Sequence, residues 1–438
     1  MQAMFDPVAK KPERREVSNA RSAYSHPPLK ILLVNKFYYL NGGSERVLFQ
    51  ERDYFRRLGH QVVDFSMQHP RNIDSAYASF FIPQVEYDGD QSLWSKIRNT
   101  ATFIHSPLAV SRLRKLVEKE RPDIVHLHNI YHQITPSIIP MLKKQGLKIV
   151  LSLHDYKLIC PSYTMLNKEV VCDYCRGYRF HGPLVHHCQG SRAKELLLSA
   201  EAYYHKWRKS YEAVDMCIAP SQFMADRISA RIPAERITVI RNGIEGDQYV
   251  PTWDDKGYAL YVGRVSRQKG IETLCKAHAA LGGAIPLKIV GTGPLLAELE
   301  RRYPDVELLG YRSGDELREC VGSASFVVLP SEWYENCPMS ALETMALGKP
   351  MIAAAIGGLP EIIDEGVTGL LFASGSVSDL ADKMLRLWRD EPLRRRMGFA
   401  AKAKQLKRHI NQVRQEAVLD VYYRLLGHER PTRGKVRA

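Results

Sequence analysis

Residues 331–350 read SEWYENCPMSALETMALGKP and decide how this part of the chain folds. The run before them, LRECVGSASFVVLP, has the pattern of a helix followed by a buried strand, and Pro338 suits the first turn of a new helix, where its missing N–H costs nothing. Strand, short loop and helix are therefore predicted in that order. Free backbone N–H groups at 337–340 would lie at the positive end of the helix dipole, which is an anion-binding arrangement.

Two glutamates flank this predicted anion site. Glu335 lies before the helix, and Glu343 lies about one and a half turns inside it. A carboxylate on each side suits a ligand that has hydroxyl groups on both sides of a diphosphate, as a nucleotide sugar does. Each glutamate taken singly also fits an exposed surface acid. The interpretation therefore depends on the motifs around them.

A second strand exit supplies positive charge. Residues 258–270 read YALYVGRVSRQKG, which predicts a strand that ends in Gly263 and Arg264, with Lys269 just before the next helix. An arginine fork and a lysine point charge at the two ends of one loop can neutralise a diphosphate. An exposed basic loop is the alternative.

Glycines follow two further predicted strands. LKIVGTGP places Gly291 and Gly293 at a strand exit, where absent side chains let a ligand approach the backbone. LKILLVNKFYYLNGGSERV places Gly42 and Gly43 after the first strand of a βαβ unit. The pattern G-x-G-x-x-G is absent there, and no acid is placed for a ribose, which argues against a dehydrogenase.

Two buried strands end in histidine. In DIVHLHN, we expect His126 and His128 to serve packing and loop hydrogen bonds. In KIVLSLHDYKLICP, His154 and Asp155 follow the strand and would lie at the carboxyl edge of a parallel sheet, where ligands bind. A histidine there could stabilise charge that develops on a ligand.

The motifs VGRVSRQKG, IVGTGP, LLGYRS, LPSEWYENCPMSALETMALGKP and IGGLPEII occur in this order over residues 258–372. In that order they resemble the donor half of a family-4 retaining glycosyltransferase of the GT-B fold. The resemblance implies an α/β fold with two Rossmann-like domains facing across a cleft, and a C-terminal helix that crosses back to the first domain.

The resemblance also implies roles. Arg264 and Lys269 would hold the donor diphosphate, Glu335 would face the sugar, Glu343 would bond the ribose, and His154 would lie near the reacting carbon, with Asp155 contacting sugar or acceptor. His154, Arg264, Lys269 and Glu335 are the expected catalytic residues. The expected donor-binding residues are Gly42, Gly43, Gly263, Gly291, Gly293, Tyr311, Asn336, Cys337, Pro338, Met339 and Glu343. The family usually has Phe-Gly or a similar pair where this chain has Asn336 and Cys337, so the sugar stays open.

The expected activity is transfer of a sugar from a nucleoside-diphosphate sugar, of UDP or GDP type, to an acceptor hydroxyl in polysaccharide or glycolipid assembly. The acceptor would be a glycan or be linked to a lipid. The predicted donor-binding domain, residues 241–406, contains no Asp-x-Asp motif, so no catalytic metal is expected. Two alternatives stay open: a GT-B sugar-nucleotide epimerase or hydrolase, and a non-catalytic glycan- or lipid-binding protein.

Length and composition agree with two domains. The chain has 438 residues, more than one core usually supports. We expect a disordered tail at 1–28, an acceptor-binding Rossmann-like domain at 29–240, a donor-binding one at 241–406, and a crossover helix at 407–428. The N-terminal residues lack the apolar segment of a signal peptide. No apolar run approaches the roughly 18 residues that span a bilayer. These features predict a cytoplasmic protein.

The charge predicts an anionic partner. The formal net charge is +14, from 62 basic and 48 acidic residues. No nucleic-acid module is recognisable, so an anionic membrane surface is favoured over nucleic acid, with the protein peripheral on the inner face. Residues 192–211 and 94–119 are amphipathic and basic, which fits this location. Helices packed on their own domain are the alternative.

Four of the eight cysteines lie within a predicted insertion at 160–190: Cys160, Cys172, Cys175 and Cys188. Four thiolates that include a CxxC pair predict a closed tetrahedral structural zinc site. An iron–sulfur cluster and unliganded or redox-sensitive thiols are the alternatives.

Overall fold

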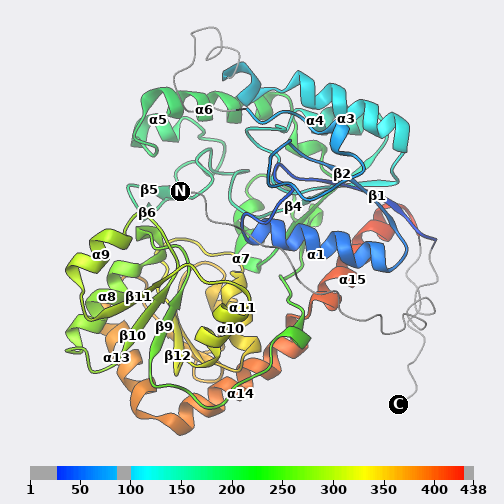
Figure 1. Ribbon diagram of the computed structural model, residues 1–438. Coiled ribbons are helices and arrows are strands. Elements are labelled where there is room, and N and C mark those ends of the chain that lie inside the picture. Colours follow the sequence, from blue (N-terminus) through cyan, green and yellow to red (C-terminus); the bar gives the residue numbers. More distant parts are fainter. Residues whose placement is uncertain (1–26, 86–99, 429–438) are drawn as a thin grey trace.

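The computed structural model describes residues 27–85 and 100–428, which form two α/β domains, each built on a parallel sheet (Figure 1). Most of the tail expected at 1–28, and the first residues of the 94–119 segment, lie outside the described residues. The fold expected from the sequence, two Rossmann-like domains, is confirmed.

The first domain has a sheet in the order β2-β1-β3-β4-β7-β8. Its strands are β1 (Lys30–Val34), β2 (Gln61–Phe65), β3 (Ile124–Leu127), β4 (Lys148–Ser152), β7 (Met216–Ala219) and β8 (Ile237–Val239). Its helices are α1 (Gly43–Arg57), α3 (Pro107–Glu120), α4 (Ile138–Lys144), α5 (Gly182–His186), α6 (Arg192–Trp207) and α7 (Gln222–Ile228), and a short antiparallel hairpin joins β5 (Leu166–Asn167) to β6 (Val170–Val171).

The second domain has a sheet in the order β11-β10-β9-β12-β13-β14. Its strands are β9 (Ala259–Val262), β10 (Leu287–Val290), β11 (Val306–Gly310), β12 (Phe326–Leu329), β13 (Met351–Ala354) and β14 (Gly369–Phe372). Its helices are α8 (Ile271–Ala280), α9 (Leu296–Arg302), α10 (Gly314–Gly322), α11 (Met339–Ala346), α12 (Leu359–Ile362), α13 (Val377–Arg389) and α14 (Glu391–Arg408). The strand order reverses between β9 and β12, and ligands of doubly wound sheets bind at such a switch point.

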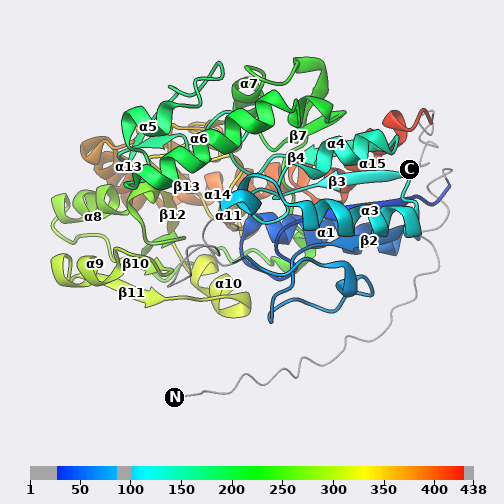
Figure 2. The same cartoon turned by 90° about the horizontal axis from the view of Figure 1, so that it is seen from above.

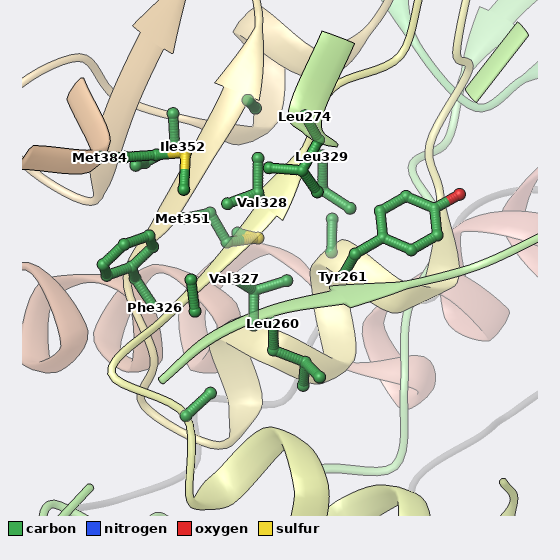
Figure 3. Close-up of a cluster of buried hydrophobic side chains, with 14 of the residues drawn as sticks. Leu260, Tyr261, Leu274, Phe326, Val327, Val328, Leu329, Met351, Ile352 and Met384 are labelled. Carbon is green, nitrogen blue, oxygen red and sulfur yellow. The ribbon is translucent and has the colours of Figure 1, made fainter. Parts of the chain in front are cut away.

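The strands form where apolar runs are fully buried. β12 reads FVVL with every residue buried, and its Val327 pairs in parallel with Met351 of β13. A continuous apolar run is typical of a parallel strand that is covered on both faces. Figure 3 shows side chains of β9, β12 and β13 packed together in the core of the second domain.

The last helix, α15 (Asn411–Leu425), returns to the first domain (Figure 2). Its Val418 and Tyr422 pack with α1 and with one face of the first sheet, whereas α3, α4 and α7 cover the other face. The crossover helix therefore exists, but it begins at Asn411 and not at 407, because α14 extends to Arg408 before the chain turns.

The two connections between the domains run side by side. The N–H of Ile244 donates to the carbonyl of His409 over 2.9 Å, and the N–H of Asn411 donates to the carbonyl of Ile244 over 3.0 Å. A Cβ at Gly243 would lie 2.7 Å from the Ile410 carbonyl oxygen, so only glycine allows this approach. The linkers are thus paired where the domains join.

Across residues 27–85 and 100–428, no helix has both the length and the apolar character that crossing a bilayer requires.

Candidate active site

Glu335 lies in the loop between β12 and α11 and is buried. Its Oε1 accepts three hydrogen bonds, from Lys269 Nζ (2.6 Å), Ser331 Oγ (2.8 Å) and Trp333 Nε1 (2.8 Å). Burial acts to raise the pKa of Glu335, but the Lys269 ammonium group and these hydrogen bonds more than offset it and lower the pKa below its usual value. The site therefore holds an ionised carboxylate at neutral pH.

Lys269 and Arg264 lie on the loop after β9, as the sequence predicts. Lys269 ends a short 3₁₀ turn, η6 (Arg267–Lys269), and its Nζ lies 4.9 Å from the centre of the Trp333 ring. Arg264 is exposed. The structure thus brings Lys269 directly onto Glu335, a pairing that the sequence alone did not predict.

Glu343 lies further along α11 and faces a different set of groups. It forms an ion pair with Arg46 of α1, and its Oε1 accepts a hydrogen bond from Tyr249 Oη over 3.0 Å. A pocket of about 300 Å³ borders it and is also lined by residues of α1 and α10, among them Phe49 and Leu317. Neither Glu335 nor His154 lines this pocket. The two glutamates therefore have different surroundings: Glu335 contacts Lys269, whereas Glu343 contacts Arg46 and borders the pocket.

The glycines at the strand exits let two loops pack against each other. A Cβ at Gly291 would lie 1.8 Å from the carbonyl oxygen of Gly263, and one at Gly293 would lie 2.2 Å from that of Val265. The backbone atoms that approach these glycines therefore belong to the neighbouring loop. Gly270, at φ +69°, likewise approaches the Pro330 carbonyl oxygen, where a Cβ would lie 1.7 Å away. These contacts fix the loop that carries Lys269.

The start of α11 differs slightly from the prediction. Pro338 has extended backbone angles and is the N-cap, so the helix begins at Met339 and the prediction of Pro338 within the first turn was wrong by one residue. Cys337 is buried, and its carbonyl accepts a hydrogen bond from Asn242 Nδ2 over 3.0 Å. Tyr311, by contrast, is 71% exposed at the end of β11 and does not line the pocket.

Two contacts bring the loops of the two domains together. Asn336 Nδ2 donates to the carbonyl oxygen of His154 over 3.0 Å. A Cβ placed on Gly43 would lie 3.7 Å from Met339 Cγ, at the start of α11. The carboxyl ends of β1, β4 and β12 therefore face one another, with Gly42 immediately before α1. The structure thus assembles one site from both domains.

His154 belongs to a buried chain of side chains. Its Nε2 lies 3.0 Å from Nδ1 of His128, whose Nε2 lies 3.2 Å from a carboxylate oxygen of Glu51 in α1. The other oxygen of Glu51 accepts a hydrogen bond over 2.6 Å from Arg414 of α15. Burial lowers the pKa of His154 well below its usual value, and it lowers the pKa of His128 to about 4. His154 is therefore neutral at physiological pH.

Asp155 accepts its hydrogen bonds from residues of its own domain. It accepts a hydrogen bond from the Tyr131 hydroxyl and another, over 2.9 Å, from the N–H of Lys157. Burial raises the pKa of Asp155, although Tyr131 and Lys36 act against the rise. The Lys36 ammonium group lies 4.2 Å from the centre of the Tyr131 ring, and burial lowers its pKa. A cation and an aromatic ring thus lie beside Asp155.

Sequence reasoning missed Arg46, Glu51 and Arg414. Arg46 and Glu343 are 297 positions apart, and Glu51 and Arg414 are 363 apart, so no local pattern connects them. A weak signal existed for Glu51, because the spacing of apolar residues in α1 places it on the buried face of the helix. His128, expected to serve packing and loop hydrogen bonds, contacts His154 directly.

The arrangement suits an anionic ligand with polar groups on both sides. The start of α11 offers backbone N–H groups, and Lys269 and Arg264 offer positive charge on the loop beside it. Glu335 and Glu343 offer hydrogen-bond acceptors at two separate points. These are the groups that a sugar diphosphate with a nucleoside would need.

Comparisons with known families agree with this geometry. The family model of glycosyl transferases group 1 matches residues 248–404, and the model of glycosyltransferase family 4 matches residues 41–248. Together they cover both domains.

The chain is also similar in sequence to individual proteins. The chain is 28% identical over 264 residues to an uncharacterized glycosyltransferase of Methanocaldococcus jannaschii, a match that covers 59% of this chain and 70% of that one. It is 22% identical over 404 residues to N-acetyl-alpha-D-glucosaminyl L-malate synthase of Bacillus anthracis, covering 87% and 92%. The match to the amylovoran biosynthesis glycosyltransferase AmsK of Erwinia amylovora, at 31% identity, covers 37% of this chain and 45% of AmsK.

Solved structures share the fold. Sucrose-phosphate synthase from Thermosynechococcus elongatus superposes with a TM-score of 0.70 at 18% identity, over 91% of this chain and 100% of that one. Anabaena HepE in complex with UDP-glucose superposes with a TM-score of 0.61 at 19% identity, over 90% and 99%. The chain belongs to the family-4 glycosyltransferases of the GT-B fold.

Proposed function

We propose that this glycosyltransferase moves a sugar from a nucleoside-diphosphate sugar to an acceptor hydroxyl and retains the anomeric configuration. One observation carries the proposal. The Lys269–Glu335 pair lies in the loop before α11, Glu343 lies within that helix, and Gly43 faces the start of the helix from the other domain. A donor lying across the start of α11 would reach all of these groups.

The donor's parts have distinct partners in this proposal. Lys269 and Arg264 hold the diphosphate with the first N–H groups of α11, Glu335 bonds the sugar, and Glu343 bonds the ribose. We take UDP as the first nucleotide to test, since the fold is shared with HepE, which was solved with UDP-glucose. Arg46 forms an ion pair with Glu343 in this structure, so a ribose hydroxyl would compete with the Arg46 guanidinium group for the Glu343 carboxylate.

Charge on the leaving group drives the step. When the anomeric bond breaks, the diphosphate gains negative charge, and the sugar becomes oxocarbenium-like. Groups that are already aimed at this charge stabilise the transition state without reorganising. We expect loss of either cation to raise the barrier by about 2–4 kcal/mol, by analogy with oxyanion donors.

His154 acts as a neutral hydrogen-bonding group. Its lowered pKa and its contact with His128 disfavour an imidazolium near the reacting carbon. In the mechanism that we propose, the acceptor attacks on the face from which the diphosphate departs, and a departing phosphate oxygen takes the acceptor's proton. This course retains the anomeric configuration and needs no protein nucleophile.

The acceptor is proposed to be a glycan or a lipid-linked sugar in polysaccharide or glycolipid assembly. The Lys36–Tyr131 contact beside Asp155 supports an acceptor that combines a sugar face with negative charge. An anionic membrane on the cytoplasmic side would bring such an acceptor, and α6 supports this because its Tyr203 and Trp207 are exposed beside basic residues.

Ligand binding followed by product analysis tests the proposal. Thermal unfolding is measured with UDP, GDP and ADP at millimolar concentration, with Glu343→Gln as a matched variant that keeps the side-chain shape. We expect one nucleotide to raise the melting temperature of the wild type and to have a smaller effect on Glu343→Gln.

The anomeric outcome is then read by NMR of the product formed from the matching sugar nucleotide, with and without magnesium. We expect the donor's configuration in both cases. Stabilisation by none of the nucleotides would contradict the donor assignment, and an inverted product would contradict the mechanism. Free sugar released without an acceptor would identify a hydrolase instead.

A further inference from the structure

The loop that joins β4 to α6 is long and mostly irregular. Within residues 153–191 the regular elements are β5, β6 and α5, each five residues or shorter. Six non-glycine residues of this loop have left-handed backbone angles: Tyr163, Met165, Lys168, Glu169, Tyr178 and His187. This conformation is unfavourable for residues with a Cβ. Additional interactions are therefore needed to hold the loop in one shape.

Four thiols belong to this loop, although no three of their sulfur atoms lie within 4.8 Å of one another. Cys160 follows β4, Cys172 follows β6, Cys175 lies in the next turn, and Cys188 follows α5. Cys160 and Cys175 are buried and the other two are half-buried. Each of the four interacts electrostatically with the other three, although they are separated by up to 28 positions in the sequence.

Two local features suit metal ligands. The N–H of Tyr174 points at the Cys172 sulfur over 3.5 Å and orients this sulfur within the CxxC turn. A Cβ at Gly182 would lie 2.4 Å from the Cys175 sulfur, so only glycine lets α5 approach this thiol. The start of α5 therefore packs closely against the Cys175 sulfur and the Tyr174 ring.

We propose that Cys160, Cys172, Cys175 and Cys188 bind one zinc ion at a structural site. Four sulfur ligands complete a tetrahedral shell and leave no position open for a substrate. The coordinating thiols would bind zinc as thiolates.

A second cluster of possible metal ligands lies in the first domain. The described residues that already bring three ligand atoms within 4.8 Å of one another are Glu51, His126 and His128. There the Arg414 guanidinium group bonds Glu51 over 2.6 Å and supplies the positive charge that a metal would bring. The four thiols are not yet this close, so zinc binding would tighten the loop around the ion.

The proposed zinc site adjoins both donor loops. At the hairpin tip, Glu169 forms an ion pair with Arg267, two residues before Lys269, over 2.9 Å. In the CxxC turn, Asp173 pairs with Arg227, which lies 3.5 Å from the hydroxyl of Tyr334. Figure 1 shows the β5–β6 hairpin between the two domains. Zinc would therefore fix the loop that touches the Lys269 and Glu335 segments.

Metal analysis of the purified full-length chain tests the site. We expect about one equivalent of zinc per chain, released when an organomercurial titrates the thiols. Cobalt substituted for zinc should give the intense absorption of a tetrahedral thiolate site. Less than about a tenth of an equivalent of zinc, with the four thiols freely titratable in the folded protein, would overturn the proposal, as would iron in place of zinc.

Variants locate the ion. Cys172→Ser and Cys188→Ser should each lose most of the zinc and become cleavable by protease within 153–191, while Cys320→Ser, outside the loop, should keep both properties. Circular dichroism checks that each variant folds, and chelation of wild-type zinc gives the same readout without any substitution. Unchanged zinc content in both loop variants would refute the ligand set.

The effect on the donor depends on the proposed function, whereas the metal content does not. If the donor assignment is right, zinc-free protein should bind the nucleotide about tenfold more weakly, because the Arg267 and Tyr334 contacts loosen. If the purified protein contains zinc but binds no nucleotide, the donor assignment is refuted and the metal site is supported. If it binds a nucleotide but contains no zinc, the metal site is refuted and the donor assignment is supported.

Discussion

Replacing Lys269 by methionine should destabilise the protein through the carboxylate that it leaves behind. The Lys269 ammonium group lies 2.6 Å from Glu335, whose side chain is 8% exposed. Coulomb's law with an effective dielectric constant of about 20 gives this pair roughly 6 kcal/mol of attraction. Removing one partner of a buried pair typically costs about 3–5 kcal/mol. We expect about 3 kcal/mol, because Ser331 and Trp333 still donate to Glu335.

The loss should depend on pH in a definite direction. In the wild type, the pKa of Glu335 is lower in the folded than in the unfolded state, so its contribution to stability is present above the unfolded pKa and is lost as pH falls through the folded value. In Lys269→Met, burial is no longer offset and the folded pKa rises above the unfolded one. Stability then falls as pH rises. The difference between the two proteins should therefore be larger at about pH 8 than at about pH 5.

Urea denaturation of four proteins measures this. The wild type, Lys269→Met, Glu335→Gln and the double variant complete a double-mutant cycle at both pH values. The double variant should recover most of the stability that Lys269→Met loses, since no buried charge remains. Lys276→Met, at an exposed position on α8, is the matched control and should change the free energy of unfolding by less than about 0.5 kcal/mol. A loss below about 1 kcal/mol, or one equal at both pH values, would refute the reasoning.

Three other outcomes are expected. Arg264→Met should lower kcat by about 10²- to 10³-fold, and Arg264→Lys should restore only part of it because the planar fork is absent; equal rates for all three would exclude a role in the transition state. Asn336→Ala removes the bond to the His154 carbonyl, worth about 1 kcal/mol, so small-angle scattering should show a larger radius of gyration, and an unchanged radius would count against this contact closing the domains. Arg414→Met should lower the free energy of unfolding by about 3–5 kcal/mol, and adding Glu51→Gln should recover part of it; no recovery would mean that packing of α15, and not the charge, is responsible.

The sequence was sufficient for the elements whose pattern is local. Buried runs such as FVVL in β12 predict parallel strands, because a strand covered on both faces is apolar throughout. The order of strand, loop and helix around Glu335 and the basic loop with Lys269 followed in the same way, and the motif order led to the correct family. The roles of the individual site residues stay predictions.

Contacts between distant segments could not be predicted. Lys269 pairs with Glu335 because Gly270 lets the β9 loop touch the end of β12, and that approach depends on the tertiary packing of two strands. The same holds for Asn336, which reaches His154 only because two separate domains face each other. A pattern read along the chain carries the residue types but not the relative orientation of the domains.

The paired linkers define where this enzyme could be recombined with another of its fold. Because Ile244 is hydrogen-bonded to both His409 and Asn411, the donor domain is joined to the rest at a single place in space. A chimera that exchanges only the chain between these two linkers would keep α15, and with it Arg414, on the domain that contains Glu51. A graft that also carried α15 from the foreign enzyme would have to supply its own partner for that carboxylate. Donor specificity should therefore be transferable with both junctions placed at the paired linkers.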